Sequence, residues 1–172
     1  VAGIFLIFIM MVILVMPGHA ESNTLQLTAA TAHPASDVEA VILTEFKRRI
    51  EERTKGYIRV QLFTHGMLGS DEQLIRGLQQ GTVDLITCAS FKYADYVPEF
   101  NVLDLPFLFF STDHLNATLD GRLGQVLKAK AQESRGEYVL GYITDGPVHI
   151  VSNKALAYIS QGKGLRVRTM LL

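Results

Sequence analysis

Two arginines near the end of the chain are the side chains best suited to hold an anion. Arg166 and Arg168 are two residues apart, so in a strand they project from the same face. A guanidinium carries a rigid fork of N–H donors that matches a carboxylate in a bidentate pair. The same spacing also fits solvated charges at a strand end. For Arg166 we favour solvation, whereas spacing alone leaves both interpretations open for Arg168.

Catalytic and metal-binding motifs are absent from the sequence. It contains no P-loop, G-x-G-x-x-G, G-x-S-x-G, H-E-x-x-H or Cys/His cluster. The histidines are scattered without metal-ligand spacing, which is typical of turn, loop and surface residues. Acidic pairs such as Asp71 and Glu72 open predicted helices, where the helix dipole favours negative charge. We therefore expect no enzyme, no metal and no cofactor.

The charge balance and the cysteine content exclude further classes of protein. The 172 residues carry 16 basic and 17 acidic side chains, for a net charge of -1. Nucleic-acid binding needs a basic surface, so we expect no nucleic-acid partner. Cys88 is the single cysteine, which rules out an internal disulfide. Nothing near it in the sequence would activate the thiol, so we interpret Cys88 as a small buried apolar residue.

The start of the chain resembles an export signal. Residues 1–16 are uncharged and almost entirely apolar, and the run is short for a membrane-spanning helix of about 20 residues. Gly18 and Ala20 supply the small residues of a signal-peptidase site. We expect a signal peptide at residues 1–20 and a periplasmic mature chain, with an uncleaved anchor helix as the alternative. The usual positive segment is missing, which indicates a truncated or misassigned start.

The first half of the mature chain predicts alternating strands and helices. Residues 25–30, 57–63 and 82–88 have strand character. Between them, Ser36 with Glu39 and Ser70 with Gln73 form two capping boxes that start helices. We expect these helices to end near Gly56 and Gly81. The order β-α-β-α-β predicts parallel strands with crossover helices, and the apolar third strand suits a sheet covered on both faces.

The second half predicts looser structure at first, then a helix and strands. Residues 89–100 are aromatic and irregular, and Pro106 excludes a regular helix around it. Ser111 can cap a helix, and residues 119–134 are mostly helical in pattern, although Gly121 and Gly124 weaken that prediction. Strands are expected at 138–143, 147–152 and 165–170. No helix follows the last of these, so we expect the covered sheet to continue beyond Leu172.

Four stretches in a fixed order resemble the solute-binding subunits of TRAP transporters, the DctP-like extracytoplasmic receptors. They are GYIRV at 56–60, residues 68–84, residues 98–109 with the block LPFLF, and GLRVR at 164–168. The resemblance runs from about residue 25 to 168. It implies an α/β, periplasmic-binding-protein-like fold of two domains. The first domain would occupy 21–145, and residues 146–172 would form the crossover strand and the start of the second domain.

The same resemblance implies a function and a set of binding residues. Members capture a small organic acid, usually a carboxylate, between the domains and deliver it to TRAP membrane permease subunits. Contact with the membrane would come only through the permease. Arg168 falls on the arginine that pairs with the ligand carboxylate. Further cleft positions, at the carboxyl ends of the first and third strands, match Ala32, His33, Ser90, Phe91 and Tyr93.

Two departures from the family pattern narrow the ligand. Some members carry a second arginine where this chain has the sequence GPV at 146–148. His149 lies beside that position, although on a strand it would face the other way. Ala89 stands where the same members place a cleft glutamate. Both differences argue against a ligand like sialic acid and leave C4-dicarboxylates, 2-oxo acids, sugar acids and aromatic acids open.

Three alternatives stay open at the level of sequence. A sensory domain could bind the same ligand and signal instead of transporting it. An exported enzyme could carry its catalytic residues beyond Leu172. The 172 residues alone could also lack a complete cleft and bind nothing.

Overall fold

A three-stranded parallel sheet forms the centre of the first half of the chain. The computed structural model describes residues 24–144, 146, 151–166 and 168. Strands β1 (Leu25–Ala30), β2 (Ile58–Phe63) and β3 (Leu85–Ile86) are arranged in the order β2-β1-β3. β1 pairs with β2 along its whole length and with β3 only at Ala29 and Ala30. The α/β class predicted from sequence is confirmed.

Strand β3 is shorter than the predicted 82–88, although its backbone follows β1 for longer. Asp84 N donates to Thr28 O at 2.9 Å, and a carboxylate oxygen of Asp84 accepts from Thr28 N at 2.7 Å. Beyond the strand, Thr87 N donates to Ala30 O at 3.3 Å. The side chain of Asp84 thus takes a bond that a backbone carbonyl would otherwise supply, and the regular ladder is limited to two residues.

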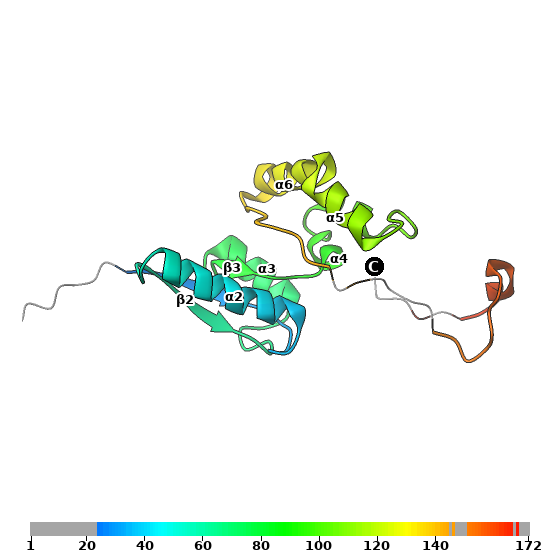
Figure 1. Cartoon of the computed structure of the whole chain (residues 1–172), viewed down its shortest axis with the longest axis horizontal. Helices are drawn as coiled ribbons and strands as arrows, with labels where there is room; N and C mark the ends of the chain where they lie inside the picture. Colours follow the sequence, from blue (N-terminus) through cyan, green and yellow to red (C-terminus); the bar gives the residue numbers. More distant parts are fainter. Residues whose placement is uncertain (1–23, 145, 147–150, 167, 169–172) are drawn as a thin grey trace, which may run out of the picture.

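Helices α2 (Val38–Arg53) and α3 (Asp71–Gln80) cover opposite faces of the sheet, with α2 in front and α3 behind (Figure 1). The connections from β1 to β2 and from β2 to β3 run in opposite directions along the sheet. Because such crossovers are right-handed, they place their helices on opposite faces. On α2 the buried residues are Ala40 and Leu43, whereas Val41 is 54% exposed. Only part of the apolar surface of this helix is therefore buried against the sheet.

One of the two predicted capping boxes is confirmed, whereas the prediction of the other, Ser36 with Glu39, is wrong. Gln73 Oε1 accepts from the backbone N–H of Ser70 at 2.8 Å, and α3 ends at Gly81 in the left-handed conformation. At the first helix the N-cap is Asp37 rather than Ser36. The carboxylate of Glu39 faces the His33 ring instead of the helix end, because the loop turns that ring toward α2.

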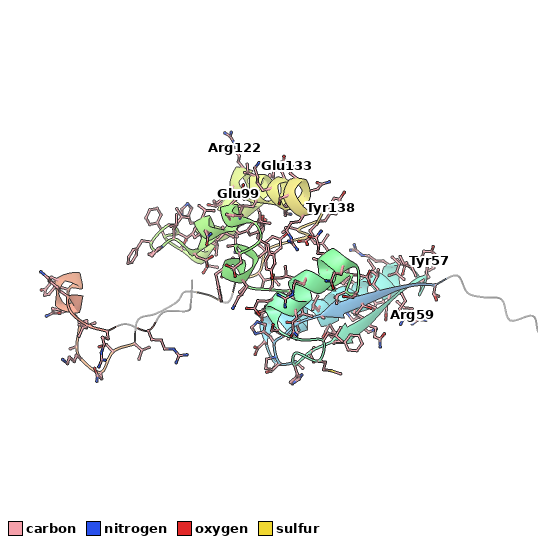
Figure 2. The ribbon with its side chains drawn as sticks, turned by 180° about the vertical axis from the view of Figure 1, so that it is seen from behind. Tyr57, Arg59, Glu99, Arg122, Glu133 and Tyr138 are labelled. Carbon is pink, nitrogen blue, oxygen red and sulfur yellow. The ribbon has the colours of Figure 1, made fainter. Side chains whose placement is uncertain are left out.

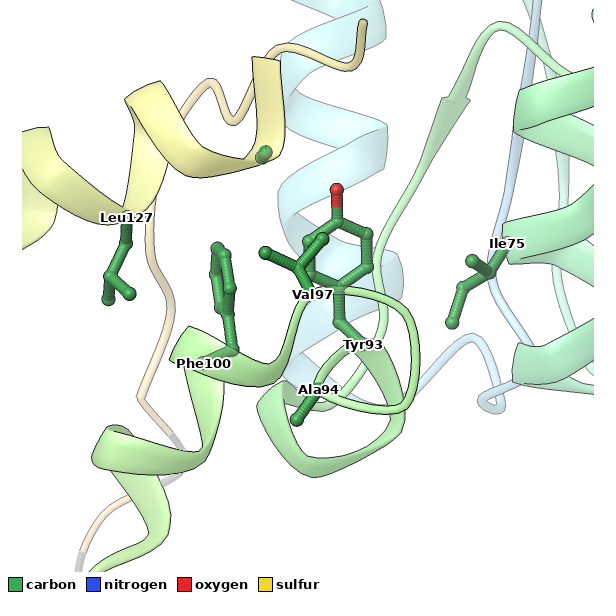
Figure 3. Close-up of a cluster of buried hydrophobic side chains, with 7 residues drawn as sticks. Ile75, Tyr93, Ala94, Val97, Phe100 and Leu127 are labelled. Carbon is green, nitrogen blue, oxygen red and sulfur yellow. The ribbon is translucent and has the colours of Figure 1, made fainter. Parts of the chain in front are cut away.

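The second half of the chain contributes helices that pack onto one another and onto α3. They are α4 (Ser90–Tyr93), the 3-10 helix η1 (Pro98–Asp104), α5 (Thr112–Asp120) and α6 (Arg122–Arg135). The region predicted to be irregular, 89–100, therefore contains α4 and the start of η1. One buried cluster joins these helices to α3 (Figure 3); its members are Ile75, Tyr93, Ala94, Val97, Phe100, Leu127 and Ala131.

A buried polar network fixes the end of α6 against α4. The hydroxyl of Tyr93 donates to Glu137 Oε2 at 2.6 Å, and Arg135 Nη2 lies 2.8 Å from Glu137 Oε1. The side chains of Arg135 and Glu137 are only 13% and 8% exposed. The guanidinium of Arg135 also stacks over the ring of Tyr96 at 4.8 Å. Each buried charge thus has a partner, which burial requires.

Cys88 packs against this cluster. Burial, with a smaller effect from the carboxylates of Asp71 and Glu137, raises the pKa of its thiol to about 12. The thiolate is the reactive form of cysteine. Cys88, interpreted from sequence as a small buried apolar residue, is partly buried in the structure, and its raised pKa fits an unreactive thiol.

Residues after α6 depart from the predicted strands. Residues 137–144 contain no strand, and residues 151–158 are exposed. The short 3-10 helix η2 (Ile159–Gly162) lies apart from the remaining helices in Figure 1. Leu165 and Arg166 are not in a strand. A strand needs a neighbour for its backbone N–H and C=O groups, and the described strands offer these segments none.

Three sequence expectations fall on residues outside this description. The expected signal peptide, 1–20, lies entirely outside it, as does His149, and so do most residues of the predicted strand 147–152. Among the described helices, none combines the length and the apolar character that crossing a membrane requires.

The predicted helix 119–134 is confirmed as α6 from Arg122 onward, whereas residues 119 and 120 belong to α5, which Ser111 caps, and a corner at Gly121 separates the two helices. The corner brings the first turn of α6 against the last turn of α5. A Cβ on Gly124 would lie 1.7 Å from the carbonyl oxygen of Leu119, so only glycine fits there.

We expect Gly124→Ala to lower the free energy of unfolding by about 2 kcal/mol, the usual range for overpacking a tight site. Helix propensity alone would give the opposite sign, since alanine is favoured over glycine by about 1 kcal/mol. Urea unfolding followed by circular dichroism measures the difference. Gly141→Ala is the control, because a Cβ there meets nothing within 4 Å. A stabilising effect of Gly124→Ala would show that the corner does not form.

We expect native Cys88 to react with a thiol reagent at pH 9 roughly a hundredfold or more slowly than in urea. A pKa of about 12 leaves far less thiolate than the ordinary value of 9.0. The colour yield of a disulfide exchange reagent gives both rates. A free cysteine peptide is the control for the chemical effect of urea. Equal rates in the two states would contradict the burial of the thiol.

Candidate ligand-binding site

The strand order creates a point in the sheet where the connections diverge. β1 leads to α2 on one side, while β3, its other neighbour, leads on to α4 (Figure 1). In open α/β sheets, ligands bind at the carboxyl ends of the strands at such a switch point. Tyr57 and Arg59 mark the opposite end, where β2 begins (Figure 2). The candidate site is therefore the edge formed by loops 31–37, 64–70 and 87–89, which we call the carboxyl edge.

Backbone hydrogen bonds hold the first two loops of the carboxyl edge together. Thr31, which is 1% exposed, donates its N–H to Phe63 O at 3.0 Å and accepts from Gly66 N at 3.3 Å. His65 N donates to His33 O at 2.8 Å. The hydroxyl of Thr31 accepts from His33 N at 3.2 Å. These bonds fix the place from which the His33 ring projects.

The ring of His33 lies between two carboxylates of α2 and its N-cap. Nδ1 is 3.4 Å from Asp37 Oδ2, and Nε2 is 3.7 Å from Glu39 Oε1. One ligand atom from each of the three residues lies within 4.8 Å of the others, so the geometry could accommodate a cation. It equally forms an ion-pair network that orients the imidazole. The motif search missed this group because it sought repeated His and Cys rather than one His with two carboxylates.

The starts of α3 and α4 add charge to the carboxyl edge. Lys92 on α4 pairs with Glu72 on α3 and lowers the pKa of that carboxyl to about 2. Burial raises the pKa of the neighbouring Asp71, an effect that nearby His33 opposes. Lys92 is therefore committed to Glu72, and Asp71 is a half-buried carboxyl without a hydrogen-bonding partner for Oδ1 among the described residues.

The structure brings several of the predicted binding residues to this edge. Ala32 and His33 lie in the loop after β1, both half-buried. Ser90 is the first residue of α4, and its hydroxyl donates to Asp104 Oδ1 at 3.1 Å. Phe91 follows it, with the Lys92 ammonium 5.6 Å from the ring centroid. Ala32 and His33 lie within the carboxyl edge, and Ser90 and Phe91 directly follow its 87–89 loop, as expected for segments that follow neighbouring parallel strands.

Two other predicted binding residues are placed differently. Tyr93 is 7% exposed, its ring packs edge-to-face on Phe100 at 4.8 Å, and its hydroxyl is taken by Glu137. In this structure Tyr93 is a core residue. Arg168 is exposed and makes no hydrogen bond or ion pair with the described residues, so the structure does not itself bring Arg168 to the carboxyl edge.

Four buried polar atoms have no hydrogen-bonding partner among the described residues. They are His33 Nε2, Asp71 Oδ1, Thr87 Oγ1 and Asp104 Oδ2. Sequence reasoning did not single out Asp71, Thr87 or Asp104 as binding residues: Asp71 was explained by the helix dipole, and Thr87 by its strand. Their position along the chain could have indicated them, since Asp71, Thr87 and Asp104 each lie on or beside a segment that follows a strand of the sheet.

Comparison with known proteins places this arrangement in a family. The family model "Bacterial extracellular solute-binding protein, family 7" (DctP) matches residues 29–171. The 2,3-diketo-L-gulonate-binding periplasmic protein YiaO of Escherichia coli is 36% identical over 135 residues, covering 78% of this chain and 41% of the relative. The C4-dicarboxylate-binding periplasmic protein DctP of Vibrio cholerae is 26% identical over 152 residues, covering 88% of this chain and 44% of the relative.

Solved structures share the same fold. A TRAP periplasmic solute-binding protein from Polaromonas, bound to D-erythronate, aligns with a TM-score of 0.61 at 30% identity, covering 64% of this chain and 36% of the other. One from Sulfitobacter, with bound β-D-galacturonate, aligns with a TM-score of 0.60 at 27% identity, covering 63% and 36%. The chain spans about two fifths of the length of its curated relatives. By its sequence and its fold, the chain belongs to the DctP family of bacterial extracellular solute-binding proteins.

Proposed function

We propose that this chain contains the first of two ligand-binding domains of a periplasmic receptor for a small organic acid. Residues 21–145 form that domain, and residues 146–172 cross into the second. The observation that carries the proposal is the family match over residues 29–171, which includes both the carboxyl edge and Arg168. The names and bound ligands of the relatives, a diketo-gulonate, erythronate and galacturonate among them, support an acid as the ligand.

The chemistry at the carboxyl edge favours binding over catalysis. The hydroxyl of Ser90 is hydrogen-bonded to a carboxylate, Asp104, and not to a histidine that could take its proton. The raised pKa of Cys88 keeps its thiol protonated. His33 is held between Asp37 and Glu39. A site with these groups would orient a ligand and leave it chemically unchanged.

Arg168 is the proposed carboxylate anchor. Its side chain is exposed and makes no ion pair with the described residues, so its donors are available to a ligand. Closure of two domains around the acid would exclude water, and the weaker dielectric screening would strengthen the ion pair. Ala32, His33, Ser90 and Phe91 would then contact the remainder of the ligand from the carboxyl edge.

The receptor would deliver its ligand to TRAP permease subunits. Its contact with the membrane would come only through these subunits. Relatives named as periplasmic binding proteins support a periplasmic location. In this scheme the receptor binds the ligand and discriminates it from other solutes, while the permease transports it across the membrane.

We expect Arg168→Ala, in the full-length receptor that carries this sequence, to weaken carboxylate binding by at least ~2 kcal/mol, or roughly thirtyfold. The reason is that the mutant leaves a desolvated ligand charge without its partner. Titration calorimetry measures the affinity, with the ligand first identified by a thermal-shift screen of organic acids. Arg168→Lys should restore only part of it, because an ammonium cannot form the bidentate pair.

Arg166→Ala is the matched control, since it removes the same group two residues away and should change affinity less than about threefold. Equal losses in the two alanine variants would point to a general charge effect. Unchanged affinity in Arg168→Ala would refute the anchor, and the absence of binding by any organic acid would refute the receptor.

A further inference from the structure

One imidazole and two carboxylates lie together where the loop after β1 meets the first turn of α2. We call His33, Asp37 and Glu39 the His33 cluster. His33 Nδ1 is 3.4 Å from Asp37 Oδ2, and His33 Nε2 is 3.7 Å from Glu39 Oε1. One ligand atom from each residue lies within 4.8 Å of the other two. The three side chains therefore border one shared space.

The side chains of the His33 cluster do not make the hydrogen bonds that their positions offer. Asp37 is the N-cap of α2, where an aspartate usually accepts from a backbone N–H of the first turn, yet its side chain makes no cap bond. His33 Nε2 is buried and has no hydrogen-bonding partner among the described residues. The distances of 3.4 and 3.7 Å from the ring to the carboxylates are also too long for good hydrogen bonds. Hydrogen bonds between its members therefore do not explain the cluster.

The charge of the His33 cluster is not compensated by the protein. Two carboxylates face one imidazole, and among the described residues neither carboxylate forms an ion pair with a lysine or an arginine. The side chains of His33 and Glu39 are only 34% and 14% exposed, so water screens the two negative charges less than it would at an open surface. A cation between the carboxylates would offset their repulsion.

The backbone holds the cluster in place before any ion binds. Asp37 N donates to Pro34 O at 3.0 Å, which closes the turn that returns Asp37 toward the His33 ring. On the other side of the loop, His65 N donates to His33 O at 2.8 Å, and the hydroxyl of Thr31 accepts from His33 N at 3.2 Å. Preorganised ligands lower the entropic cost of binding.

The chemistry of the donors selects the class of cation. Ca²⁺ and Mg²⁺ prefer oxygen ligands alone, whereas an imidazole nitrogen with carboxylate oxygens suits zinc and similar transition metals. Ligands about 2.0–2.1 Å from a tetrahedral zinc lie about 3.4 Å from one another, close to the 3.4 and 3.7 Å observed here. An imidazole binds an ion through one nitrogen, so rotation of one carboxylate side chain completes the set. Water would fill the remaining position.

We propose that His33, Asp37 and Glu39 bind a divalent transition-metal ion of the zinc type. The ion would join the loop after β1 to the first turn of α2. This inference departs from the expectation of no metal drawn from the sequence, which considered histidine and cysteine spacing. Binding of the ion does not depend on Arg168 or on the identity of the acid.

Titration calorimetry on the full-length receptor, freed of metal with EDTA and without an affinity tag, measures the binding of Zn²⁺ near neutral pH. We expect saturable binding of Zn²⁺ and a higher melting temperature in its presence, because the ion binds the folded site. Ca²⁺ and Mg²⁺ should bind far more weakly. No binding of Zn²⁺, or equal binding of Zn²⁺ and Ca²⁺, would overturn the proposal.

Three single substitutions assign the ion to the cluster. His33→Gln, Asp37→Asn and Glu39→Gln each remove a ligand at similar size, and asparagine caps a helix as well as aspartate does. Each should weaken Zn²⁺ binding at least ~10-fold, since even the loss of a group that only orients a metal ligand costs this much. His65→Gln is the control, because His65 is exposed in the neighbouring loop. Unchanged binding in His33→Gln, or an equal loss in His65→Gln, would overturn the assignment.

Chemical modification of the unaltered receptor tests His33 without any substitution that could disturb folding. Diethyl pyrocarbonate acylates accessible imidazoles, and the side chain of His33 is 34% exposed. Saturating Zn²⁺ should protect His33 and leave the rate at His65 unchanged, as measured by peptide mass spectrometry. Equal protection of both histidines, or of neither, would overturn the proposal. If an acid binds and Zn²⁺ does not, the receptor function stands and this inference fails.

Discussion

The structure depends on the position of β1, which is hydrogen-bonded on both sides. Its pairing with β2 fixes six residues in register, and its shorter pairing with β3 fixes two. Because β1 is central, the chain must leave it toward β2 and later return past it to β3. That reversal places α2 and α3 on opposite faces and opens the loops after β1 and β3 at the same edge. The candidate site follows from the strand order, before any side chain is considered.

The helices after β3 are held to this frame by packing and by one polar network. The buried cluster extends from Ile75 on α3 to Leu127 and Ala131 on α6. Tyr93, Glu137 and Arg135 add a buried hydrogen-bonded chain between α4 and the end of α6. Their geometry explains why Tyr93, although it follows β3, lies in the core: α4 is a single turn, so Ser90 and Phe91 lie at the edge while Tyr93 turns inward.

Local signals in the sequence predicted the elements with their own caps and periodicity. The helix from Ser70 to Gly81 was predicted with both ends correct, because a capping box and a left-handed glycine are local devices. The mostly helical pattern of residues 119–134 is confirmed by α6, but the corner at Gly121 was not predicted, since the clash that Gly124 avoids with Leu119 depends on the three-dimensional structure. Residues 138–143 alternate like a strand, yet no described strand lies beside them. Strand character is local, whereas a strand exists only with a neighbour.

The same distinction applies to the candidate site. Ala32, His33, Ser90 and Phe91 could be placed at the edge from sequence, because the ends of parallel strands meet whatever their side chains are. Asp71 could not, since its first-turn position has a sufficient explanation in the helix dipole. Only the fold shows that Asp71 is half-buried and that its Oδ1 has no hydrogen-bonding partner among the described residues. A carboxyl that stabilises a helix start is ordinarily solvated, whereas burial raises the pKa of Asp71 and so opposes its charged form.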